Sequence, residues 1–156
     1  MNVATNSQTE RLLSEQLGFL VGRFSGPEIM HETTWAPAAR AVGRAVGRLT
    51  SFALIHEQVQ EQSGAATFSA LNVFALDRVT GQVVMYSFDS AGFLPDPPAR
   101  GSWVDGELVL ARSTDRGQSR TRYSRTDRGY RWHKEYRPSD DTEWATVVEG
   151  HMHAEA

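Results

Sequence analysis

Apolar and polar residues alternate with a period of two along most of the chain after Gly18. This period is typical of strands with one buried face, and turn residues separate the runs. The runs predict about ten strands, at about 19–26, 41–52, 54–62, 66–77, 82–89, 100–104, 107–114, 118–127, 129–137 and 143–152. Before them, a cap-like Ser7-Gln8-Thr9-Glu10 and helically spaced leucines predict one short helix over roughly residues 8–18.

The residues between the later strands favour tight hairpins. Thr80-Gly81, Asp105-Gly106, Arg116-Gly117 and Arg128-Gly129 tolerate the positive φ that such turns need. Strands joined in this way pair antiparallel in chain order, and they either stack as a sandwich or close as a barrel. Closure removes the exposed edges, so we favour it. We predict a mainly β fold: a single up-and-down antiparallel β-barrel of about ten strands at 19–153, after an N-terminal segment and short helix at 1–18.

Composition narrows the possible chemistry. The chain has 156 residues, 40% hydrophobic and 22% charged, which is typical of one globular domain. It has no cysteine, which excludes disulfides, thiolate nucleophiles and cysteine-ligated metals. The five histidines have no compact ligand spacing, so we expect no metal site. No apolar run is long enough to span a bilayer and Met1–Glu10 is polar, so we expect a cytoplasmic protein with no membrane partner.

The charge distribution is uneven. The net charge is −3, yet Arg112 to Arg137 contains nine basic residues against three acidic ones. Arginines beside Tyr123 could follow a phosphate backbone. Because the chain is acidic overall and has only one lysine, we interpret them as solvated strand faces paired with Asp and Glu, and expect no nucleic-acid partner. Whether the barrel forms a homodimer stays open.

Strand parity indicates what a barrel would enclose. In 129–137 one face carries Tyr130, Trp132, Lys134 and Tyr136, and we expect this aromatic face to point inward. We expect the same of Val84, Tyr86 and Phe88, and of Thr121, Tyr123 and Arg125. The phenol and indole groups need polar partners, which favours a ligand-sized lumen, although the rings could simply be core.

Three further polar positions are candidates for chemistry: His56, His31 and Asp89. His56 shares its face with Gln58 and Gln60, and we expect that polar face to point outward into solvent. His31 lies where the first strand leaves the barrel, where it could act as a general base or simply bond the loop backbone. Asp89 ends a strand, where it suits either an Asx-type turn or a carboxylate at the cavity rim. Arg44 and Arg48 share a parity and are expected to face solvent.

Several short motifs resemble known barrel families. The stretch from Gly18 to Gly26 looks like the opening strand of calycin-type barrels, with Phe24 in place of the usual Trp. The order and spacing of further motifs resemble a bacterial family of lipocalin-like domains of unknown function: His31-x-x-x-Trp35-x-Pro37, Gly43-Arg44, Asp77-x-x-Thr80-Gly81, Phe88-Asp89-Ser90-x-Gly92, Gly101-x-Trp103-x-x-Gly106 and Trp144-x-x-Val147-x-Glu149-Gly150. This resemblance implies the fold and a ligand-sized cavity, not a reaction.

A more distant resemblance is to nitrobindin-like barrels, which bind haem through a histidine on a late strand. The first strand here departs from their Gly-x-Trp pattern at Phe24, and Pro27 follows Gly26. His133 and His151 are the late-strand histidines that such a site would test.

The leading hypothesis is therefore a barrel that binds a small apolar or aromatic molecule and needs no cofactor. The expected ligand-binding residues are Phe24, Trp35, Tyr86, Phe88, Trp103, Tyr123, Tyr130 and Trp132. The alternative is a cofactor-independent isomerase or cyclase with His31 and Asp89 as acid–base residues, and haem binding is third.

Overall fold

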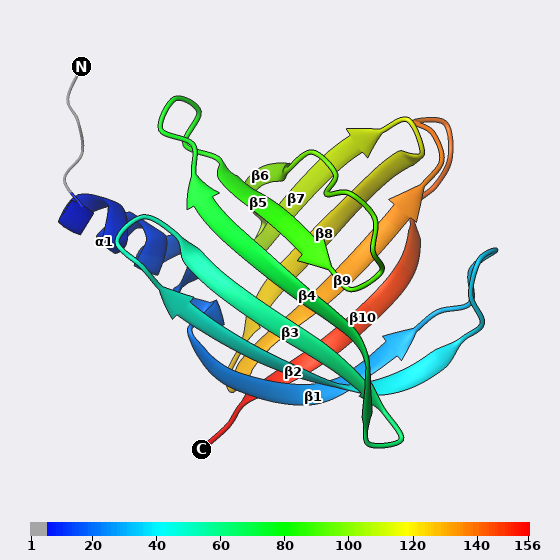
Figure 1. Cartoon of the computed structure of the whole chain (residues 1–156). Helices are drawn as coiled ribbons and strands as arrows, with labels where there is room; N and C mark the ends of the chain where they lie inside the picture. Colours follow the sequence, from blue (N-terminus) through cyan, green and yellow to red (C-terminus); the bar gives the residue numbers. More distant parts are fainter. Residues whose placement is uncertain (1–5) are drawn as a thin grey trace.

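A computed structural model describes residues 6–156 and shows a closed antiparallel barrel with one helix before it (Figure 1). Within the described residues the barrel has ten strands, which pair in chain order, and the last strand pairs with the first. The elements are α1 (Asn6–Leu17), the 3₁₀ turn η1 (Gly18–Leu20), β1 (Gly22–Met30), β2 (Ala39–Leu49), β3 (Leu54–Gln62), β4 (Ala65–Leu76), β5 (Val83–Asp89), β6 (Ala99–Val104), β7 (Glu107–Thr114), β8 (Gly117–Thr126), β9 (Gly129–Arg137) and β10 (Ala145–Ala154).

The predicted fold class is confirmed, and most strand boundaries agree within about two residues. The first five residues of the predicted N-terminal segment lie outside the described residues. The largest difference is β1, which runs on to Met30 through Pro27. The ladder to β10 has no paired positions at Gly26 and Pro27, where proline has no N–H to donate, so the strand continues past the proline on its pairing with β2. No described helix is long and apolar enough to cross a membrane.

Helix α1 and turn η1 close one end of the barrel (Figure 1). Their apolar side chains Leu13, Leu17 and Leu20 are fully buried and join the main hydrophobic cluster. Two polar contacts hold the end of α1: the Trp103 indole donates to the Gln16 carbonyl at 3.2 Å, and Arg125 donates to the Glu15 carbonyl at 3.0 Å. Both satisfy carbonyls that the end of a helix leaves without partners.

An aromatic layer lies directly behind this helical plug. Phe19 packs edge-on against Trp103, Tyr123 and Tyr130 at centroid distances of 5.4–6.0 Å. Phe24 packs against Tyr130 at 5.1 Å. This layer packs the barrel interior next to the helix, so the helix end is part of the hydrophobic core.

The faces of β2, β8 and β9 agree with the predicted parity. Tyr130 and Trp132 point inward, while Arg44 and Arg48 are exposed. On the outer face, Arg120 and Arg122 form ion pairs with Glu135 at 2.9 and 3.0 Å. The expected pairing with acidic residues therefore holds for Arg120 and Arg122, whereas Arg125 donates to the Glu15 carbonyl and packs over the Trp103 ring.

Two parity predictions are wrong. His56 is fully buried inside the barrel, together with Gln60, instead of facing solvent. On β5 the inward face carries Val83 and Met85, so Tyr86 points outward with 47% of its surface exposed. The pairing with β4 decides the second case, because the buried Phe74 is opposite Met85. Phe88 shares the outward parity of Tyr86 but lies at the strand end, where it borders the open end of the barrel.

Candidate functional site: a cavity at the open end of the barrel

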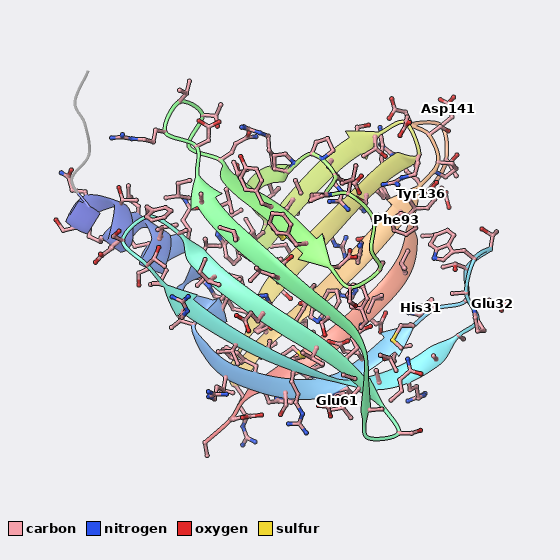
Figure 2. The ribbon with its side chains drawn as sticks, in the orientation of Figure 1. His31, Glu32, Glu61, Phe93, Tyr136 and Asp141 are labelled. Carbon is pink, nitrogen blue, oxygen red and sulfur yellow. The ribbon has the colours of Figure 1, made fainter. Side chains whose placement is uncertain are left out.

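The end of the barrel opposite α1 contains a cavity of about 820 Å³ that opens to solvent. Figure 2 shows three residues around this end: His31 directly after β1, Phe93 in the loop after β5, and Tyr136 on β9. The volume lies within the range of 300–1,000 Å³ that is typical of small-molecule sites. The barrel is therefore packed at one end and hollow at the other.

Aromatic and aliphatic side chains form much of the cavity wall. Trp132 of β9 and Tyr123 of β8 are Cα partners on neighbouring strands, and both line the cavity. Phe68, Met85 and Leu110 contribute from β4, β5 and β7. Burial raises the pKa of the Tyr123 phenol, so this ring is a neutral wall group at any physiological pH.

The rim of the cavity combines exposed apolar side chains with ion pairs. Trp35 packs edge-on against Tyr136 at 5.5 Å, and Phe93 projects from the loop at 90–98 with 75% of its surface exposed. Asp96 of that loop accepts from Arg112 at 3.1 Å and from Arg116 at 2.6 Å. These two ion pairs connect the loop to β7 and to the turn between β7 and β8.

A chain of buried polar groups lies on the β3–β5 side of the barrel. The Ser87 hydroxyl donates to Oδ1 of Asn72 at 2.8 Å, and Nδ2 of Asn72 lies 3.5 Å from Nδ1 of His56. An amide nitrogen can only donate, so we assign the imidazole proton to Nε2, which lies 3.4 Å from the Tyr130 hydroxyl. Burial lowers the pKa of His56 to about 4, so the imidazole is neutral at pH 7.

Glu28 is a buried carboxyl group on β1. It is 3% exposed and accepts a hydrogen bond from the Gln60 amide at 2.6 Å. Burial raises its pKa to about 7, and the bond from Gln60 opposes that shift. Gly43 on β2 makes room for it, since a Cβ at that position would lie 2.1 Å from Oε1 of Glu28. The absence of a side chain at Gly43 therefore accommodates a buried carboxyl group.

The structure separates the predicted ligand-binding residues into three groups. Trp35, Phe88, Tyr123 and Trp132 line the cavity. Phe24, Trp103 and Tyr130 belong to the packed layer at the helix end, and Tyr86 lies outside the barrel. Parity alone could not separate Tyr123 and Trp132 from the packed layer, because both sets face inward and differ only in their position along the barrel axis.

The two candidate acid–base residues, His31 and Asp89, both line the cavity. Nε2 of His31 lies 3.1 Å from the Glu149 carboxylate, which also lines a shallow groove on the outer face of β10. Asp89 accepts the Ala91 N–H at 2.9 Å, the Asx-turn arrangement that was one of its two predicted interpretations. Each side chain thus has a local partner in the described structure.

Sequence reasoning missed several polar groups of the cavity, above all Lys134 and Arg112. Lys134 was predicted to face inward but was given no role. A usable signal was present: it is the only lysine of the chain and stands between Trp132 and Tyr136 on an aromatic face. Gln58 and Gln60 were missed because the polar face of β3 was expected outside, and Asn72 of β4 was given no role.

Comparison with known proteins supports the fold. The sequence matches no protein-family profile and no curated protein. Its structure is similar to the crystal structure of Rv2717c from M. tuberculosis, with a TM-score of 0.75 and 14% sequence identity. The superposition covers 93% of this chain and 98% of that protein. At this identity the similarity shows a shared barrel fold and nothing about a ligand.

Proposed function

We propose that this protein binds a small, largely apolar molecule in the cavity at the open end of the barrel. The observation that carries the proposal is an 820 Å³ space walled by Trp132, Tyr123, Phe68 and Leu110 and open at a rim of exposed aromatic residues. A barrel of purely structural role would fill this space with side chains, as the helix end does. We also propose that the protein is lipocalin-like, on the basis of its sequence motifs and of a barrel that is open at one end.

The first prediction concerns Trp132, which presents its ring to the cavity. We expect the neutral fluorophore 1-pyrenebutanol to bind the wild-type protein with one site per chain. Trp132→Ala should weaken binding about fivefold or more, since loss of a central aromatic contact costs more than about 1 kcal/mol. Fluorescence anisotropy of the pyrene measures the affinity in both proteins.

Tyr86→Ala is the matched control for this experiment. Tyr86 is an aromatic residue that the sequence placed in the lumen and the structure places on the outer face. We expect its removal to leave the affinity unchanged. Equal losses in both variants, or no saturable binding to the wild type, would contradict the proposal.

Acid–base catalysis in the cavity is second to binding. It is favoured by the position of His31 and Asp89 at the rim, where a bound molecule would pass. It has less support than binding because His31 is engaged with Glu149 and Asp89 with its own turn. A proton-transfer role requires that a substrate replace one of these partners.

Haem binding has the least support among the three hypotheses. The late-strand histidines His133 and His151 line the shallow groove on the outer face, together with Glu149. Inside the barrel, His56 is engaged by Asn72 and Tyr130 and lies behind the cavity wall. These residues do not fit an axial ligand from a late strand, and we derive no chemistry through haem.

A further inference from the structure

Lys134 is a cation without a counterion in the wall of the cavity. Its ammonium group forms no hydrogen bond or ion pair with any residue from 6 to 156. Burial, reinforced by the positive charge of Arg112, lowers its pKa, and the negative charges of Asp89 and Asp96 act in the opposite direction. Lys134 is half-buried, and a largely desolvated ammonium group without a partner is costly, so the site favours an anion beside it.

The charges around Lys134 also favour an anion. Arg112 and Arg116 are both bound to Asp96, and Asp89 is the other carboxylate near the lysine. Three cations thus face two carboxylates at this part of the cavity. One further negative charge would balance the group.

The neighbours of Lys134 indicate what kind of anion would fit. Thr121 is its Cα partner on β8, lines the cavity, and has a hydroxyl that bonds to no other residue of the described chain. Trp132, two residues before Lys134, lies on the same inward face and continues the wall toward the closed end. A cation and a hydroxyl near the mouth, followed by an aromatic wall deeper in, fit a molecule with one charged end.

We propose that the ligand is an amphipathic monocarboxylic acid whose carboxylate binds Nζ of Lys134 and the Thr121 hydroxyl, with its apolar body against Trp132 and Tyr123. This inference rests on the proposed function and specifies its ligand class. The acid enters with its apolar end first and leaves its carboxylate near the mouth. A charge-assisted hydrogen bond of this kind is among the strongest polar contacts available in a cavity.

A pair of probes with the same apolar body tests the inference. The wild-type protein should bind 1-pyrenebutyrate about tenfold or more tightly than 1-pyrenebutanol at pH 7. Lys134→Met, which keeps the length of the side chain but removes its charge, should reduce the affinity for pyrenebutyrate to that for pyrenebutanol. Lys134→Arg should retain a preference for the acid.

Arg131→Met is the matched control, because it removes one positive charge from an exposed position on the same strand. It should leave the preference for pyrenebutyrate intact. An equal affinity of the wild type for both probes would overturn the carboxylate inference while leaving the cavity proposal standing. Failure of both probes to bind would overturn the two together.

A second measurement observes Lys134 in the protein with its wild-type sequence, and a variant serves only to assign the signal. Since Lys134 is the only lysine, reductive methylation with ¹³C-formaldehyde labels it and the N-terminal amine alone. The NMR signal missing from Lys134→Met identifies its dimethylamine. Saturating pyrenebutyrate should raise the pH midpoint of that signal, whereas pyrenebutanol should not. An unchanged midpoint with bound pyrenebutyrate would contradict a carboxylate at Lys134.

Discussion

Glu28 shows how a single residue inside this barrel couples stability to pH. Its carboxyl group is buried, Gln60 donates to it, and its pKa is raised to about 7. The folded protein therefore holds this proton more tightly than the unfolded chain does. The stabilisation from this group is complete below its ordinary pKa of 4.5 and is lost as the pH rises through about 7.

We expect Glu28→Gln to remove this dependence. An amide mimics the protonated carboxyl group and still accepts from Gln60. The variant should match the wild type near pH 4.5 and exceed its free energy of unfolding by roughly 2–3 kcal/mol at pH 8. Urea unfolding across this pH range measures the difference. Glu57→Gln, at an exposed position of β3, should change stability by less than about 0.5 kcal/mol, and a pH-independent gain in Glu28→Gln would refute the assignment.

At the scale of elements, helix α1 closes one end of the barrel and contributes to its core. Leu13 and Leu17 are fully buried against the aromatic layer, whereas Leu12 on the same helix is 41% exposed. The helix carries little stability of its own at 12 residues, so its packing on the barrel holds it in place.

Leu17→Ala should therefore destabilise the protein by about 2–5 kcal/mol, the range for truncating a buried leucine. Leu12→Ala makes the same chemical change at the exposed position and should cost less than about 1 kcal/mol. Thermal and chemical unfolding of the two variants compare them directly. Similar losses in both would mean that the plug is not packed as described.

The elements also show where sequence reasoning succeeded and where it failed. The ends of the strands were predictable because the turns between them need residues that adopt positive φ, such as Gly81 and Gly106. Which face of β5 points inward was not predictable from the sequence. Both faces carry apolar residues, and the register with Phe74 of β4 decides between them. His56 was misplaced because a polar inner face is expected only when the interior is already known to be partly hollow.

At the scale of the whole molecule, the barrel depends on the seam between β1 and β10. Gly26 lies at this seam, and a Cβ there would come within 1.9 Å of the His151 carbonyl oxygen. The close approach of the two backbones therefore requires glycine. The barrel's division into a packed end and a hollow end was beyond sequence patterning, because it depends on side-chain volumes summed around the ring.

Gly26→Ala should destabilise the barrel at the seam between β1 and β10, by about 1–3 kcal/mol or more, because a backbone atom rather than a flexible side chain must move. Gly18→Ala is the control, since the added methyl group would meet only the Ser14 hydroxyl oxygen, at 3.5 Å. Hydrogen exchange should locate the damage in β1 and β10. Uniform exchange across the barrel in Gly26→Ala, with no focus at the seam, would contradict this role.

The seam also affects folding during synthesis, because it joins the first strand of the barrel to the last. Phe24 pairs with Ala154, so the contact that closes the ring joins residues from almost opposite ends of the chain. While the ribosome is still synthesising β10, strands β1 and β9 each present a row of unpaired N–H and C=O groups that can recruit other chains. Such a distant contact also slows folding. The nascent chain thus passes through a stage that is vulnerable to aggregation, and β10 ends it.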